Sequence, residues 1–233
     1  MFLFCSKFMP GQGRFSQGST TMPEFIQPAF DFIEPPDPRR PKRPERVFTC
    51  IGAGTAAADA VRCRERIKRD NAILAKGIAP ERFHISLCGL GDYVRIPSRV
   101  PFAAMRAARC IALSPFEVVL YRAVTFPGFN PDRRPTVLLA QSGELRELGA
   151  VLFGHLRREG LKAGELITPH MTLFYSPRSI RPVDIEPIRF RVDRFYLIHS
   201  ERGLTRYNVL GCWLLNGLGL ATAGPLAFGS MAA

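Results

Sequence analysis

Between residues 46 and 215, apolar residues occur in short runs that contain β-branched side chains or alternate with polar residues. This pattern is typical of β-strands, in which successive side chains point to opposite faces. Gly, Pro, Asn and Asp residues separate many of the runs and indicate turns. We therefore expect strands at 47–53, 83–89, 116–126, 135–140, 170–176, 188–200 and 206–215.

Three further segments are predicted to be helical. The first spans 56–77, with Thr55 as its cap and Gly77 as its end, and the second spans 98–113. The third, 142–160, has leucines at the spacing of an amphipathic helix and begins at the capping residue Ser142. The first and third helices are each followed by a strand that starts near a histidine, which indicates an internal duplication.

The two ends of the chain differ from the region between them. Residues 1–44 are rich in Gly, Ser, Gln and Pro and finish in a basic cluster at 39–43. Proline at this density disfavours both helix and sheet, so we expect a flexible, solvated tail, with phosphate binding by the basic cluster as the alternative. Residues 216–233 form an apolar, Gly-rich tail that is too interrupted for a membrane span. The region between the two tails, 45–215, is predicted to form the folded domain.

Composition and charge limit the class of protein. Of the 233 residues, 46% are hydrophobic, which is enough for a packed core, and the formal net charge is +12. A surplus of positive charge favours polyanionic partners. The six cysteines are scattered without a CxxC pair, and the N-terminus lacks a signal-peptide pattern. We therefore expect a cytoplasmic protein without a disulfide framework, a metal site or a cofactor.

The most informative feature is a pair of similar tetrads. The first tetrad is His84-Ile85-Ser86-Leu87, and the second is His170-Met171-Thr172-Leu173. Residues two apart in a strand share a face, so each tetrad presents one imidazole and one hydroxyl to the same side. Only four histidines occur in the chain, and the other two are interpreted as surface or turn residues.

Two such pairs suit the cleavage of a phosphodiester. A neutral imidazole can accept a proton from the attacking group, while an imidazolium can donate one to the leaving oxygen. The two hydroxyls can donate hydrogen bonds to the non-bridging phosphate oxygens. We therefore predict His84 and His170 as catalytic residues and Ser86 and Thr172 as phosphate-binding residues, in a scheme that requires no metal.

The tetrads and their flanking segments, RFHISLCGLGDY and TPHMTLFYSP, resemble the 2H phosphoesterase superfamily, specifically its bacterial 2′-5′ RNA ligase-like branch. The resemblance also covers the opening run ERVFTCI and the closing runs VDRFYLIHSERG and RYNVLGCW. It implies an α+β fold of two pseudo-symmetric lobes of antiparallel sheet, with helices outside and a central groove. It further implies hydrolysis of 2′,3′-cyclic phosphates at RNA ends to 2′-phosphomonoesters, and in some members reversible 2′,5′ ligation. The expected partners are RNA ends or 2′,3′-cyclic nucleotides, with no membrane, and a monomer is favoured.

The chain departs from that family at two positions. Relatives commonly have an aromatic residue five positions after the first histidine and an arginine five after the second, where this chain has Gly89 and Tyr175. Arg178 lies close enough in sequence to replace the arginine, and Tyr175 could stack on a base, although strand parity favours its packing in the core. The secondary candidates for substrate contact are Tyr175, Arg178, Arg206 and Tyr207.

Two other functions stay open at this point. The same groove could belong to a non-catalytic module that binds RNA ends or nucleotides. Alternatively, Gly52-Ala53-Gly54-Thr55-Ala56-Ala57 fits the GxGxxA turn of a dinucleotide-binding protein. That turn requires an acidic residue at the end of a second parallel strand, where this chain continues a predicted helix and then places His84.

Overall fold

The computed structural model describes residues 41–128, 130–164 and 168–218, all within one compact unit. The helices are α1 (Ala57–Asp70), α2 (Arg99–Arg109) and α3 (Gly143–Arg158), with short 3₁₀ turns at Gly54–Ala56, Pro80–Arg82 and Pro131–Arg133. The strands are β1 (Glu45–Gly52), β2 (His84–Tyr93), β3 (Phe116–Thr125), β4 (Arg134–Gln141), β5 (His170–Ser176), β6 (Val183–Val192), β7 (Arg194–Glu201) and β8 (Arg206–Leu214).

These strands form one sheet in the order β6-β3-β4-β5-β2-β1-β7-β8, and each pairing among the described residues is antiparallel. The strands that carry the two tetrads, β2 and β5, lie at its centre. We call β2, β1, β7 and β8 the first lobe, and β5, β4, β3 and β6 the second lobe. In each lobe the tetrad strand pairs with the strand that precedes it in the chain, so the predicted two-lobed antiparallel α+β fold is confirmed.

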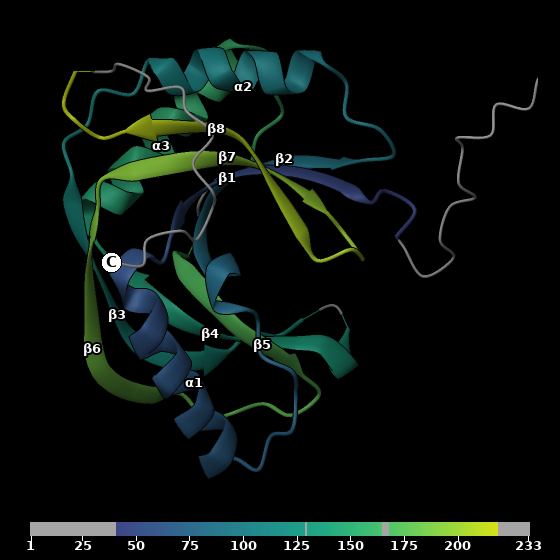
Figure 1. Cartoon of the computed structure of the whole chain (residues 1–233), viewed down its shortest axis with the longest axis vertical. Helices are drawn as coiled ribbons and strands as arrows, with labels where there is room; N and C mark the ends of the chain where they lie inside the picture. Colours follow the sequence, from purple (N-terminus) through teal and green to yellow (C-terminus); the bar gives the residue numbers. More distant parts are fainter. Residues whose placement is uncertain (1–40, 129, 165–167, 219–233) are drawn as a thin grey trace, which may run out of the picture. The chain divides into compact units, whose positions relative to one another are not determined.

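The helices tie the two lobes into one core. Helix α1 connects two strands of the first lobe but packs against β5 and β6 of the second lobe, whereas α3 connects two strands of the second lobe and contacts β2 (Figure 1). Helix α2 packs against α3 and against β7 and β8. Four fully buried leucines of α3 belong to the same hydrophobic cluster as the apolar residues of both tetrads. The helices therefore cover one face of the tetrad strands and leave the other face for polar side chains.

Helix α1 ends at Asp70, well before the predicted end at Gly77. The chain leaves the helix through Ala72, which has a positive φ of 50°, and the Ile73 N–H donates to the Lys68 carbonyl at 2.8 Å. This bond closes the kind of helix end at which glycine usually occupies the left-handed position. Because alanine occupies it here, a rule based on glycine placed the end too far along the chain.

The two predicted helix caps have opposite outcomes. Ser142 caps α3, since its side chain accepts a hydrogen bond from the Leu145 N–H at 3.3 Å, as predicted. Thr55 does not cap α1, because it lies inside a 3₁₀ turn and Ala56 precedes the helix without a side-chain cap.

The predicted strand 188–200 is in fact two strands, β6 and β7, which belong to different lobes and are separated by Asp193.

The antiparallel sheet also excludes the dinucleotide-binding alternative. The turn at 52–57 follows β1, but β1 pairs antiparallel with β2 and β7. The dinucleotide fold requires a parallel βαβ unit, in which the pyrophosphate meets the helix at the carboxyl ends of the strands. The glycines of this segment serve a tight connection from β1 to α1.

Most residues of the two predicted tails, 1–44 and 216–233, lie outside the described ranges. Of those that are described, Pro44 accepts a hydrogen bond from the Arg202 N–H at 2.8 Å, and the Gly217 N–H donates to Leu113 at 3.0 Å. Cysteines 50, 63, 88, 110 and 212 are free. Among the helices that the structure describes, none has the length and apolar character needed to cross a membrane.

Candidate active site

The two tetrads meet at the centre of the sheet. Ile85 in β2 lies directly opposite Met171 in β5, and both side chains are fully buried on the helix-covered face. Because side chains alternate along each strand, the polar residues on either side of this pair point to the opposite face. We call this surface the histidine face and define it by four residues: His84, Ser86, His170 and Thr172. Extending the antiparallel register by one residue places His84 opposite Thr172 and Ser86 opposite His170.

Each imidazole is held in the same way. The Nδ1 atom of His84 lies 2.8 Å from the Arg82 carbonyl, and that of His170 lies 2.7 Å from the Thr168 carbonyl. A carbonyl oxygen only accepts hydrogen bonds, so Nδ1 carries the proton in both rings. The neutral form of each ring consequently has its lone pair on Nε2, which is the atom available to accept a proton.

The two histidines have different surroundings. Burial lowers the pKa of His84 from an ordinary 6.5 to about 4, and the positive charges of Arg82 and His170 act in the same direction. The hydrogen bond to the Arg82 carbonyl opposes this shift. His84 is therefore neutral near pH 7.

Aromatic rings surround the imidazoles. The ring centroid of His84 lies 5.1 Å from that of Phe48 and 5.7 Å from that of Tyr207, while His170 lies 4.9 Å from Phe126. Phe48 also belongs to a small second apolar cluster on this face of the first lobe. The rings exclude water from one side of each imidazole and fix its orientation.

A matching irregularity in β2 and β5 brings a further pair of residues to the histidine face. Each strand contains one extra residue, Leu87 in β2 and Leu173 in β5, where its register against the neighbouring strand shifts. Such a bulge reverses the side-chain alternation beyond it. Phe174 is consequently buried in the core and Tyr175 is 43% exposed. The parity argument for packing Tyr175 in the core is therefore wrong.

The fifth residue after each histidine thus faces the site. At Gly89 a side chain would meet no atom within 4 Å, so the first lobe leaves open space there. In the second lobe the Tyr175 ring lies 5.3 Å from the guanidinium carbon of Arg133. The pKa of Tyr207 is raised mainly by burial, and the Tyr175 phenol contributes to the increase.

The other three residues predicted as possible substrate contacts lie in different places. Tyr207 lies beside His84 on the histidine face. Arg178 donates to the Ala72 carbonyl at 3.2 Å, just beyond the end of α1. Arg206 precedes Tyr207 in β8 and therefore points to the opposite face, where it lies 3.5 Å from Glu201.

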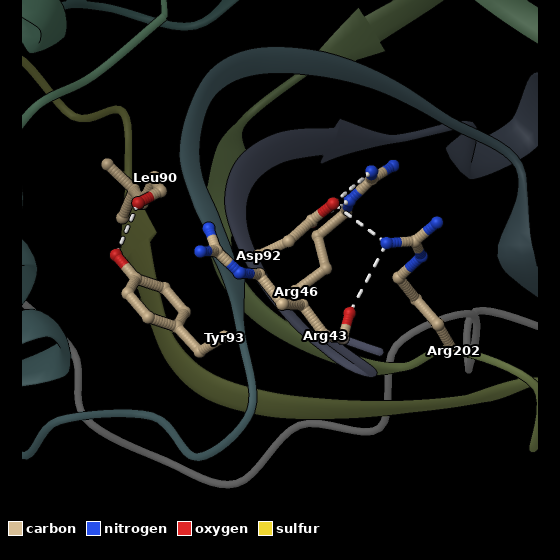
Figure 2. A network of polar contacts seen from close by, with 6 residues as sticks. All are labelled: Arg43, Arg46, Leu90, Asp92, Tyr93 and Arg202. Atoms are coloured by element: carbon tan, nitrogen blue, oxygen red, sulfur yellow. Dashed lines mark hydrogen bonds and ion pairs between the residues drawn. The ribbon is translucent and has the colours of Figure 1, made fainter. Parts of the chain in front are cut away.

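A cluster of arginines lies at the far end of β1 and β2 (Figure 2). Arg46 binds Asp92 through two hydrogen bonds of 2.6 and 2.9 Å, and Arg202 binds the same carboxylate at 2.7 Å. The hydrogen bond from Arg46, together with the charges of Arg202 and Arg43, lowers the pKa of Asp92. Two guanidinium groups thus bind one carboxylate, and Arg202 also donates to the Arg43 carbonyl at 3.3 Å.

Several residues of the site escaped prediction from the sequence. Arg82, Phe48, Phe126 and Arg46 all lie beside the histidine face or its rim. Arg82 could have been recognised from the sequence, because it precedes His84 by two residues and residues two apart in an extended segment share a face. The others depend on how β1 pairs with β2 and on where the loops after β3 run, and neither is readable from hydrophobic periodicity.

The site has the groups for acid–base chemistry. Neither the hydroxyls of Ser86 and Thr172 nor the Nε2 atoms of the two histidines hydrogen-bond to another described residue, so they can meet a ligand. Within the described ranges, no group of three or more His, Cys, Asp or Glu side chains is arranged to hold a metal ion. The arrangement can move protons and bind an anion with its own side chains.

Comparison with known proteins gives a family match. A family model described as the 2′-5′ RNA ligase superfamily matches residues 55–204, which include both tetrads. No curated protein sequence matches the chain.

Solved structures share the fold. TT0787 of Thermus thermophilus has 20% sequence identity and a TM-score of 0.61, over 74% of this chain and 98% of that one. E. coli LigT complexed with 3′-AMP has 24% identity and a TM-score of 0.57, also over 74% and 98%. A protein described as a phosphoesterase has 25% identity and a TM-score of 0.54, over 74% and 99%.

Proposed function

The chain belongs to the 2′-5′ RNA ligase superfamily, and from this membership we propose that it is a phosphodiesterase for RNA ends. Its substrate is a 2′,3′-cyclic phosphate, and its product is a 2′-phosphomonoester. The observation that carries the proposal is the pairing of Ile85 with Met171, which turns two imidazoles and two hydroxyls toward one surface. The structure of LigT with 3′-AMP supports a nucleotide ligand.

The reaction requires two proton transfers. A water molecule attacks phosphorus and forms a new P–O bond, while one neutral imidazole accepts its proton at Nε2. The P–O3′ bond breaks, and the other histidine, as imidazolium, donates its Nε2 proton to the departing O3′. The product keeps its phosphate on O2′. Since both Nδ1 atoms are held by backbone carbonyls, neither ring can flip to present the wrong nitrogen.

The phosphate oxygens need donors while charge is held on them. Ser86 and Thr172 supply one hydroxyl from each lobe, at positions adjacent to the histidine of the opposite strand. Tyr175 offers an exposed ring for the nucleobase, and base–aromatic stacking does not depend on a particular base. Tyr207 borders the site next to His84.

The same groups can run 2′,5′ ligation. In that case the 5′-hydroxyl of a second RNA replaces water, a P–O5′ bond forms and the same P–O3′ bond breaks. Between the forward and the reverse reaction the two histidines exchange the roles of acid and base. Ligation therefore adds a substrate and no further catalytic group.

The test is turnover of adenosine 2′,3′-cyclic monophosphate in the presence of EDTA, followed by chromatographic identification of the product. We expect adenosine 2′-monophosphate to form at a rate that chelation leaves unchanged, because side chains supply the acid, the base and the anion donors. Activity that is lost with EDTA and restored only by a divalent ion would overturn the mechanism. Binding of the cyclic nucleotide without turnover would identify a non-catalytic binding module.

A further inference from the structure

Arg82 occupies an unusual position next to the proposed catalytic residue His84. It ends the 3₁₀ turn Pro80–Arg82, and its carbonyl holds the imidazole Nδ1. Its side chain lies over the ring of Tyr207, with the guanidinium carbon 4.4 Å from the ring centroid. Tyr207 comes from β8, at the edge of the first lobe, and its ring lies 5.7 Å from that of His84. The arginine is thus connected to His84 through both its backbone and its side chain.

The charge of Arg82 has no carboxylate partner among the described residues. Its Nε atom is buried and makes no hydrogen bond within the described part of the chain. The contrast with Arg46 and Arg202 is clear, because both of those arginines bind Asp92. Arg82 as a whole is half-buried. A buried N–H without a hydrogen-bond partner costs free energy, so such groups normally have a partner.

We propose that Arg82 is a phosphate-binding residue, whose counter-ion is the anionic phosphodiester held between His84 and His170. This inference rests on the proposed function and adds a cation to its substrate site. The ring of Tyr207 holds the guanidinium in place, as cation–π contacts do for arginine. The positive charge that relatives carry in the second lobe, at the position of Tyr175, is thereby supplied from the first lobe.

Arg82 also acts on the charge state of His84. The charged or titratable groups near this imidazole are Arg82 from the 3₁₀ turn, His170 from β5 and Tyr207 from β8. The positive charge of Arg82 adds to burial in lowering the pKa of His84. Removal of that charge should therefore raise the pKa of His84, while a lysine at this position should keep it low.

The test combines ligand binding with an NMR titration of the full chain. Inorganic phosphate and adenosine 2′-monophosphate are the probes, and Arg82→Met, Arg82→Lys and the control Arg106→Met are the variants. Arg106 lies on α2, where it pairs with Glu159, so its replacement removes the same charge far from the site. Arg82→Met should weaken both probes roughly 10- to 100-fold, as expected for a charge-assisted hydrogen bond, and Arg106→Met should bind them like the wild type.

The lysine variant separates a role in charge from a role in packing. If Arg82 binds phosphate through its charge, Arg82→Lys should recover most of the affinity for inorganic phosphate. It should also keep the NMR titration midpoint of His84 low. Phosphate binding that is unchanged in a folded Arg82→Met protein would overturn the proposal. If the wild type binds phosphate but does not cleave the cyclic nucleotide, the proposed function fails, and the binding comparison still decides the role of Arg82.

Discussion

Ile85 and Met171 lie directly opposite each other in the central strand pair, and each is the second residue of its tetrad. The local two-fold relation of the lobes therefore passes between them. If the antiparallel register is extended by one residue in each direction, His84 lies opposite Thr172 and Ser86 lies opposite His170, so each hydroxyl is beside the histidine of the other lobe. In the proposed mechanism, neither tetrad forms a complete site by itself. Any change that shifts the register of β2 against β5 should damage both halves of the site together.

The first prediction concerns the two hydroxyls. Ser86→Ala and Thr172→Val should each lower kcat/KM by about 10- to 100-fold, because each removes one hydrogen bond to a charged phosphate. Steady-state kinetics with the cyclic nucleotide measures the effect. Thr172→Ser retains the hydroxyl and should stay near the wild-type rate. A Thr172→Ser protein as impaired as Thr172→Val would show that the methyl group matters and the hydroxyl does not.

The second prediction concerns Tyr175, which the bulge at Leu173 turns toward the site. Tyr175→Ala should weaken the binding of adenosine 2′-monophosphate by about 1–3 kcal/mol, the usual contribution of base–aromatic stacking. Inorganic phosphate should bind as it does to the wild type, because it has no base. Calorimetry on both ligands checks this. Tyr175→Phe keeps the ring and should bind the nucleotide normally, and equal losses in the two variants would rule out stacking.

The third prediction concerns pH. In the free protein, the NMR titration midpoint of His84 should fall near 4, since burial and two nearby cations disfavour the imidazolium. Between pH 6.5 and about 4 the unfolded chain binds this proton and the folded chain does not. The contribution of His84 to stability is therefore present above pH 6.5 and lost as the pH falls toward 4. Urea denaturation across this range should show the loss.

The matched variant for this measurement is His84→Gln, which cannot take up the proton. Its stability should depend less on pH over the same interval. A His84→Gln protein with the same pH dependence as the wild type would mean that another group is responsible. Bound inorganic phosphate should raise the His84 midpoint in the wild type, because an adjacent anion favours the imidazolium.

The central parts of the fold and of the candidate site are readable from the sequence because both follow from local patterns. Alternation predicts most strands, and two copies of a four-residue motif, spaced by a lobe, point to two strands that meet. The capping serine of α3 was likewise predictable, because its side chain binds a neighbouring backbone N–H.

The remaining features depend on interactions between distant segments. The bulge at Leu173 arises from the pairing of β5 with β4, so strand parity alone misplaced Tyr175. The division of 188–200 into two strands reflects the crossing of the chain from one lobe to the other at Asp193. Arg82 contacts Tyr207, 125 residues later (207 − 82), through a packing arrangement that no sequence period encodes.

The most direct test of the account is turnover by His84→Ala, His170→Ala and the double variant, with adenosine 2′,3′-cyclic monophosphate as substrate and with folding verified by thermal melting. Each single replacement removes one proton transfer and should lower kcat by about 10²- to 10⁴-fold. The double variant should be much less impaired than the product of the two effects, because members of one catalytic unit are not additive. His155→Ala, on α3, is the control and should retain the wild-type rate. Near-normal turnover by a folded His170→Ala protein would contradict the proposed acid–base pair.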